Sequence, residues 1–414
     1  KADKLVTVVK AAQDVSTGDD SLAAVLKSAE KAVQMEEVIA AEEVKKKQVE
    51  EAAKAAGKSY EEIAAEIKAA TEAAAKKAKA LLKVVKKVDD VKEAVNAAPA
   101  TPVGGDEAPA VVALDADDIF GKLGDVVTLT ETATNVGSEA GFESVLENAK
   151  DADKLVTVVE AAKGLEGAED SLAAVLKSAD QAVQMEKVVA AENQKKQEVQ
   201  AKLEAAQAAG EDIAAIEQEI QAAAEAAAKK AKALLTVVKK VDTARDAQKK
   251  AAAETPAVPG EGTPVVEAPA VKVDDVFNNF SAVVDLADKA GDIDGGDATL
   301  LENVLNNADQ ANELKEMVEK SEAVALEAKA KARADAIAAL GEGATDAEKA
   351  AAQLAASEQI AAPALTNLFA NADKASDLKA MVEKSEAVAL EAKAKAGADA
   401  IAALGEGATD AEKA

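Results

Sequence analysis

The chain contains no cysteine, no histidine and no tryptophan, and it has one tyrosine and five phenylalanines among its 414 residues. Without cysteine it has no thiol nucleophile and cannot form a disulfide, a thiolate zinc site or an iron–sulfur cluster. Without histidine it also lacks the usual base near neutral pH and the commonest metal ligand in proteins. We therefore expect no catalytic residues, no bound metal and no cofactor, and we expect that the protein is not an enzyme.

A core filled with aromatic side chains is excluded as well. Hydrophobic residues make up 49% of the chain, but more than half of them are alanine, and charged residues add another 30%. Alanine, glutamate, lysine, leucine and valine in such proportions are typical of long helices and coiled coils. The sequence therefore predicts an all-α fold whose cores are thin and rich in methyl groups.

Negative charge dominates the chain, because 77 acidic residues against 49 basic ones give a net charge of −28. Such an excess repels nucleic-acid phosphates and anionic lipid headgroups. No stretch approaches the roughly 18 consecutive apolar residues of a membrane-spanning helix. We expect the chain to bind copies of itself, as a homo-oligomer or polymer, with no nucleic acid and no membrane span. Divalent cations that bridge carboxylates would help such copies to pack.

The chain is built from tandem repeats, which are the strongest signal in the sequence. Residues 3–35 recur at an offset of 150, and 317–350 and 381–414 agree at 33 of 34 positions, a period of 64. A shorter motif, Leu-x-Asn/Ser-Ala-x-x-Ala-x-x-Leu/Met, recurs through these repeats and predicts one reused helical element. Its copies begin at Leu26, Leu146, Leu176 and Leu305, and at Phe369 with phenylalanine as the first residue.

Proline divides the repeats from one another. Seven of the eight prolines lie in two segments, 96–114 and 254–273. Proline fixes φ and cannot continue a helix, so we expect extended connectors there. The predicted organisation is helical repeat 1 (1–95), a linker (96–114), repeat 2 (115–253), a linker (254–273), and repeat 3 (274–414) with the internal 64-residue duplication.

A seam of apolar residues spaced alternately three and four apart runs from Tyr60 to Val95, and Lys77 alone interrupts it. The second copy repeats the seam from Ile213, with Lys230 in the place of Lys77. This spacing predicts a helix of roughly 38 residues, about 57 Å long at 1.5 Å per residue, that packs along a partner. A polar residue at such a seam usually fixes register at some cost in stability, so Lys77→Leu is expected to raise the melting temperature.

Each seam helix follows another long stretch of helical composition, at about 21–56 in the first copy and 171–209 in the second. Gly57 separates the two stretches in the first copy, and Ser59 and Glu62 then follow with the spacing of a capping box. We therefore expect each large repeat to contain two short helices followed by a long, coiled-coil-like antiparallel helical hairpin.

Three patterns resemble functional sites but are better explained by helix ends. Segment 291–302 carries aspartates beside glycines and resembles a calcium loop. Counted from Asp292, however, the fifth and sixth positions are Gly296 and Asp297, the reverse of such a loop, and the twelfth is Asn303 instead of glutamate. Segment 341–350 has glycines without the lysine or the strand of a phosphate loop. The pairs at 117–118 and 274–275 fit the acidic first turns of short helices anchored by phenylalanine. An acid–base pair is the alternative for these aspartates.

The function that these features favour is structural self-assembly. Tandem repeats, long hairpins, proline-rich spacers and missing catalytic residue types predict a subunit of an extracellular filament, sheath or surface layer, with helical bundles packing head to tail between chains. Both ends of the chain fall inside a repeat, as in a piece of a longer array. The alternatives are a non-catalytic stalk, adhesin or scaffold spacer, and an amphipathic-helix protein of lipid surfaces, which the negative charge opposes. We expect an extracellular or cell-surface location.

Overall fold

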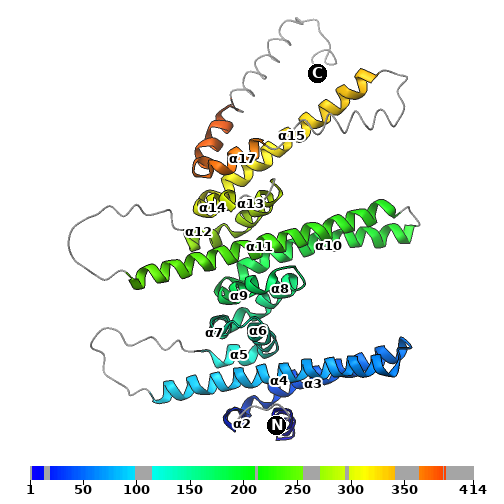
Figure 1. The fold of residues 1–414 in the computed structure, drawn as a ribbon, viewed down its shortest axis with the longest axis vertical. Helices are drawn as coiled ribbons and strands as arrows, with labels where there is room; N and C mark the ends of the chain where they lie inside the picture. The colour runs from blue at the N-terminus through cyan, green and yellow to red at the C-terminus, as the bar shows by residue number, and fades with distance from the viewer. Residues whose placement is uncertain are drawn as a thin grey trace, which may run out of the picture. The chain divides into compact units, whose positions relative to one another are not determined.

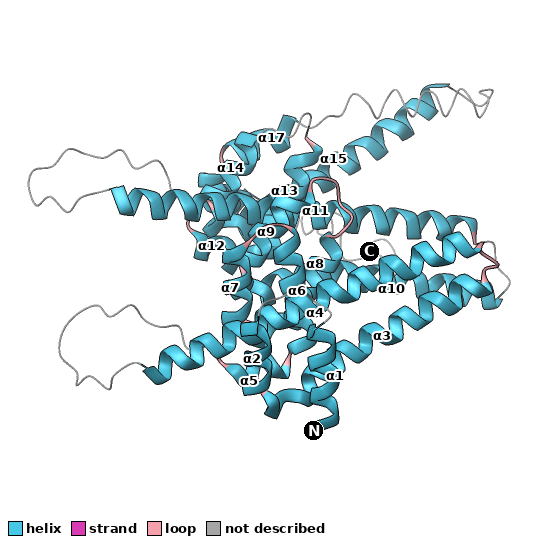
Figure 2. Ribbon diagram, turned by 60° about the horizontal axis from the view of Figure 1, so that its bottom comes forward, coloured by secondary structure: helices cyan, strands magenta, loops and turns pink. Residues whose placement is uncertain are grey.

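The fold is all-helical, as predicted. The computed structural model describes residues 2–13, 19–97, 114–209, 213–254, 271–293, 298–340, 363–385 and 387. Within these ranges every regular element is an α-helix or a short 3₁₀ helix, and none is a strand (Figure 1, Figure 2). The chain divides into two compact units, Lys1–Val258 and Pro259–Ala414. Most of each predicted proline-rich linker, and most of the second copy of the 64-residue duplication, lie outside the described residues.

The first unit contains two successive groups of helices that follow the sequence repeat, and we call them the first and second helical sets. The first set consists of α1 (Ala2–Gln13), α2 (Asp19–Lys27), η1 (Ala29–Lys31), α3 (Ala32–Ala55) and α4 (Tyr60–Ala97). The second set consists of α5 (Ala116–Gly121), α6 (Leu123–Asn135), α7 (Glu139–Glu147), η2 (Ala149–Asp151), α8 (Ala152–Ala162), α9 (Ala168–Lys177), η3 (Ala179–Gln181), α10 (Ala182–Ala209) and α11 (Ala214–Glu254).

The long helices predicted at 21–56 and 171–209 are each interrupted, so that part of the prediction is wrong. A 3₁₀ turn separates α2 from α3, where the Lys31 N–H donates to the Ser28 carbonyl over 2.9 Å. The same turn separates α9 from α10 after Ser178. Both serines leave the helical region of φ and ψ and are buried. The turn redirects the chain, so the shared motif encodes a corner between two helices.

The long helix α4 packs along α3 and is also covered by α2 and α6 (Figure 1). It spans 38 residues, which matches the predicted length. The seam residues Ile63, Ile67 and Ala70 are half-buried, whereas Leu81 and Val84 are fully buried. The difference follows from the number of neighbours, since α2, α3 and α6 all contact α4 and α3 alone runs beside its N-terminal half (Figure 1).

The turn between α3 and α4 has the predicted capping geometry. The Ser59 N–H donates to the Glu62 carboxylate over 2.8 Å, and the Glu62 N–H donates to Ser59 Oγ over 3.3 Å. Gly57 lies at φ +65°, in the left-handed region that closes a helix C-terminus. These two caps satisfy backbone groups at both sides of the turn and place α3 and α4 side by side.

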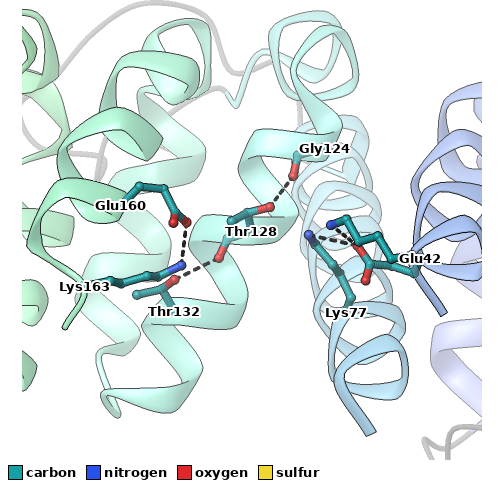
Figure 3. Close-up of polar contacts among 8 residues, drawn as sticks. Glu42, Lys77, Gly124, Thr128, Thr132, Glu160 and Lys163 are labelled. Atoms are coloured by element: carbon teal, nitrogen blue, oxygen red, sulfur yellow. Dashed lines mark hydrogen bonds and ion pairs between the residues drawn. The ribbon is translucent and has the colours of Figure 1, made fainter. Parts of the chain in front are cut away.

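Helix α6 is the central element of the second set, because it contacts α4, α7 and α8. Its threonines occupy alternate positions, and two of them, Thr130 and Thr132, are buried. Each hydroxyl donates to the carbonyl four residues earlier. The distance is 2.8 Å from Thr130 to Val126 and 3.0 Å from Thr132 to Thr128, the bond that Figure 3 shows. These internal bonds let a helix with polar residues lie buried between neighbours without unpaired hydroxyls.

The second unit reuses the same helical corner. Helices α13 and α14 pack together, and α15 and α17 complete the group. Its two 3₁₀ turns are joined through Gln310, whose side chain donates to the Asp373 carbonyl and accepts from the Ser376 N–H. The elements are α12 (Val273–Asn278), α13 (Phe280–Asp292), α14 (Ala298–Asn306), η4 (Ala308–Gln310), α15 (Ala311–Leu340), α17 (Pro363–Ala370) and η5 (Ala372–Lys374).

Close packing of α7 on α9 depends on Gly141. A methyl group at Gly141 would lie 2.8 Å from Leu176 Cβ and 2.6 Å from Ser138 Oγ. We expect Gly141→Ala to lower the free energy of unfolding by about 1–3 kcal/mol through overpacking. The matched control is Gly124→Ala in α6, where an added methyl group meets nothing within 4 Å and should stabilise by about 0.5 kcal/mol. Urea denaturation of both variants measures the difference, and equal effects would contradict this account.

Candidate functional site

The candidate site of the first unit is the contact between its two helical sets, where α6 packs against α3 and α4. Side chains of α5 and α7 also bond to side chains of η1 and α4. Lys31 of η1 lies at one edge of this contact. Its ammonium group bonds the Asp117 carboxylate at 2.8 Å and lies 5.5 Å from the centroid of the Phe120 ring. The hydrogen bond from Lys31 lowers the pKa of the Asp117 carboxyl. A lysine of the first set is therefore bound to both a charge and a ring of the second.

A pair of lysines on α4 makes a second set of bonds to α7. Lys83 bonds Glu139 at 2.8 Å and Lys87 bonds Glu143 at 2.9 Å. The Lys83 ammonium group also lies 4.1 Å from the centroid of the buried Phe142 ring, within the range of a cation–π contact. The two lysines are four residues apart on α4, and the two glutamates are four residues apart on α7. Each doublet therefore lies on one face of its helix. The two ion pairs fix which turn of α7 faces which turn of α4.

Each helical set also has an internal ion pair in the same place. Lys27 of α2 bonds Asp89 of α4 at 3.1 Å, and Lys177 of α9 bonds Asp242 of α11 at 2.8 Å. The carboxylates raise the pKa of both lysines. The repeat in the sequence is therefore matched by a repeated contact between the short helix and the long helix of each set.

Lys77, the polar residue of the seam, has a carboxylate partner. Its ammonium group lies 3.2 Å from Glu42 of α3, and the two side chains are only 17% and 13% exposed (Figure 3). Burial alone would raise the pKa of the Glu42 carboxyl, but the hydrogen bond from Lys45 and the charge of Lys77 hold that pKa below its ordinary value. Lys77 is therefore half-buried in the packing of α4 on α3, with its ammonium group on a carboxylate. This partly buried partner reverses the sign that we expect for Lys77→Leu, because the substitution would leave Glu42 with Lys45 alone as its ion-pair partner.

A pair of carboxyl groups on α6 and α8 has shifted pKa values of opposite sign. Burial raises the pKa of Asp125, and the charge of Asp153 raises it further. Asp153 also feels burial, but its bond to Lys122, at 3.1 Å, lowers its pKa overall. Acid–base catalysts use such pairs. Here Asp153 is exposed and bound by a lysine, so the group is explained as a charge network that links neighbouring helices.

Cavities lie between helices of the described part of the chain, and three of them are described by their walls. One of about 430 Å³ lies between α8, α10 and α11 and is lined by Val156, Val189 and Leu234. Another, of about 410 Å³ between α4 and α6, is lined by several lysines, including Lys76 and Lys79. The third, of about 610 Å³, lies in the second unit beside α15 and α17. The walls of all three are mainly apolar, and the second also carries several lysines in an acidic protein.

The predicted helix starts are confirmed and the other patterns are not tested. Helices α5 and α12 begin with the two aspartate pairs in their first turns, and Phe120 and Phe277 are buried as anchors. Residues 294–297 of the aspartate–glycine loop and the whole of 341–350 lie outside the described residues. In the described part of the chain, no three acidic, histidine or cysteine side chains are grouped to hold a metal ion. None of its helices has the length and apolar character needed to cross a membrane.

Comparison with known proteins gives no relative. No protein family model, no curated protein and no solved structure matches this chain.

The residues that join the two helical sets were missed by sequence analysis. Lys83 and Lys87 look like an ordinary charged helix face, as do Glu139 and Glu143. The available signal is their equal spacing of four residues on two helices of adjacent sets. A chain rich in lysine and glutamate contains many such equal spacings. This one therefore identifies a contact only when α7 is already known to lie beside α4.

The Lys77–Glu42 pair can be tested by a double-mutant cycle. We expect Lys77→Met to lower the free energy of unfolding by about 1 kcal/mol, since it removes the charge that faces a partly buried carboxylate. The folded-state pKa of Glu42 lies below its ordinary 4.5, so its contribution is complete above the unfolded value and is lost as pH falls through the folded one. The coupling with Glu42→Gln should vanish at low pH. Lys68→Met, at an exposed lysine 4.0 Å from Glu72, is the control with little expected effect.

The contact between the helical sets can be tested at Lys83. Lys83→Met keeps most of the side-chain length but removes the ion pair with Glu139 and the cation–π contact with Phe142. An exposed ion pair alone contributes little, so we expect a loss of about 1 kcal/mol, mainly from the ring contact. Lys79→Met, at an exposed lysine one turn earlier on the same side of α4, should change stability much less. If both variants unfold at the same urea concentration, Lys83 does not stabilise the contact.

Proposed function

We propose that the chain is a structural, self-assembling repeat protein, a subunit of an extracellular filament, sheath or surface layer, and not an enzyme. In this proposal its coiled-coil-like helical hairpins and proline-rich linkers belong to a repeated building unit, and helical bundles of different chains pack head to tail. The observation that carries the proposal is the contact between the two helical sets of the first unit. There, one repeat serves as the packing surface of the next.

Such a contact propagates because its two sides differ. The first set offers α3 and α4 to α6 of the second set, and ion pairs add η1 on one side and α5 and α7 on the other. A surface that binds a different surface on the next repeat can continue without limit unless the rotation closes a ring. Repeat arrays are stable through these neighbour contacts, since each repeat alone buries little apolar area. Because this chain is rich in alanine, its repeats depend strongly on contacts with their neighbours.

A stalk, adhesin or scaffold spacer is the second candidate. Stacking of repeats within one chain would be enough for such a spacer, and no contacts between chains would be needed. An amphipathic-helix protein of lipid surfaces is the third candidate, and the net charge of −28 opposes its binding to anionic headgroups. Flotation of the protein with neutral and anionic liposomes separates this candidate from the other two.

Assembly should strengthen with salt. At −28 per chain, close packing of copies meets repulsion that physiological salt screens beyond about 8 Å. We expect light scattering and electron microscopy to show growing polymers along a NaCl series, and stronger growth with CaCl₂ at equal ionic strength if cations bridge carboxylates. Circular dichroism at each step controls for folding. A folded chain that stays monomeric at high concentration and high salt would overturn the proposal and leave the spacer function.

A further inference from the structure

Lysines gather around an apolar surface in the cavity between α4 and α6, which we call the lysine cavity. Its volume is about 410 Å³, within the range of pockets that hold small molecules. Ala80 and Leu82 of its lining are buried, and Glu131 is the one carboxylate among the lining residues. The lysines of the lining are Lys76, Lys79, Lys83 and Lys86. A local excess of positive charge thus surrounds apolar atoms in a chain whose net charge is −28.

All four lysines lie on one face of α4, because they follow one another at spacings of three, four and three residues. Helix α6 packs against α4 along this stretch and forms the other wall. Lysine side chains lay their aliphatic stems along apolar surface and hold the ammonium group in water. The lysine cavity is therefore apolar inside and cationic at its edge.

Three polar groups at this cavity are unused. Other lysines of α4 bond carboxylates, as Lys83 does with Glu139 at 2.8 Å. The exposed side chains of Lys76, Lys79 and Asn135 have no ion-pair or hydrogen-bond partner among the described residues. Two ammonium groups and one amide N–H₂ are thus available as donors, and anionic oxygens are the acceptors that form the strongest hydrogen bonds with such groups.

We propose that the lysine cavity binds an amphipathic organic anion, a free small molecule with an apolar body and a carboxylate, sulfonate or phosphate group. The apolar body would contact Ala80 and Leu82. Glu131, on the α6 wall, repels the anionic group, which we therefore place beside Lys76 and Lys79.

The net charge of the chain does not prevent such binding. Exposed charges are screened beyond about 8 Å at physiological salt, and the charges that line the cavity are mainly positive. This inference goes beyond the proposed function, because the ligand would bind a single chain as well as a polymer.

Two dyes that differ only in the anionic group test the proposal. 8-Anilinonaphthalene-1-sulfonate carries a sulfonate, and N-phenyl-1-naphthylamine is its neutral analogue. In fluorescence titrations at low salt we expect Lys76→Gln combined with Lys79→Gln to weaken the tightest sulfonate-dye site by about tenfold, since two charged donors at an exposed edge are lost. The affinity for the neutral dye should stay the same.

Matched variants control for charge and folding. Lys47→Gln combined with Lys68→Gln removes the same charge from exposed positions of the first set outside this cavity, and should leave the sulfonate dye bound as in the parent. Asn135→Asp keeps the side-chain size but adds a carboxylate, so it should weaken binding of the sulfonate dye alone. Circular dichroism checks that every variant is as helical as the parent.

Three results would overturn the proposal. The first is equal affinity of the parent and the Lys76→Gln/Lys79→Gln variant for the sulfonate dye. The second is an equal loss of both dyes, since the lysines would then act through packing alone. The third is co-sedimentation of the parent, but not of that variant, with phosphatidylglycerol vesicles, which would assign the cavity to a lipid headgroup.

Salt separates this inference from the proposed function. Binding of the sulfonate dye should weaken along the NaCl series in which assembly is expected to strengthen. A chain that never polymerises refutes the proposed function and leaves the dye titrations unaffected.

Discussion

The small apolar area of alanine is the constraint on which the whole structure depends. At about 25 cal/mol per Å² a buried methyl group stabilises far less than a leucine, so a helix in this chain needs neighbours on several sides. Helix α4 shows the effect along its own length. Residues 81–88 are covered by three helices and include most of its buried leucines and valines, whereas its N-terminal half, with α3 beside it, is only partly buried (Figure 1). Stacking of repeats thus supplies the burial that a single repeat lacks.

The 3₁₀ corner makes this stacking possible. A single helix from 21 to 56 would present one continuous stripe to one partner. The break at Ala29–Lys31 turns α2 away from α3, so α2 packs on α4 while α3 runs beside the same helix. The second set repeats this arrangement with α9, α10 and α11, including the ion pair from the short helix to the long one. The 3₁₀ turn therefore lets a third, shorter helix pack on the two long helices of each set.

Sequence analysis predicted what depends on local or periodic chemistry. The length of α4, the capping box at Ser59 and Glu62, the acidic starts of α5 and α12 and the half-buried Lys77 all follow from spacing along one helix. The 3₁₀ break was missed because Ser28 is an acceptable helix residue, and only its burial in the corner shows why the helix bends there. The partner of Lys77 was not identified because Glu42 lies 35 residues away on another helix.

Ion pairs and apolar side chains have different roles where the two helical sets meet. Lys83 and Glu139 are about one third and two thirds exposed, so their attraction is largely screened and contributes little free energy. Their geometry is nevertheless specific, because a shift of α7 by one helical turn would leave a charge of each doublet without its partner. Alanine-rich surfaces have few large side chains to prevent such a shift by shape alone. In a chain with thin cores, the apolar contacts therefore supply most of the energy, and the paired lysine and glutamate doublets select the register.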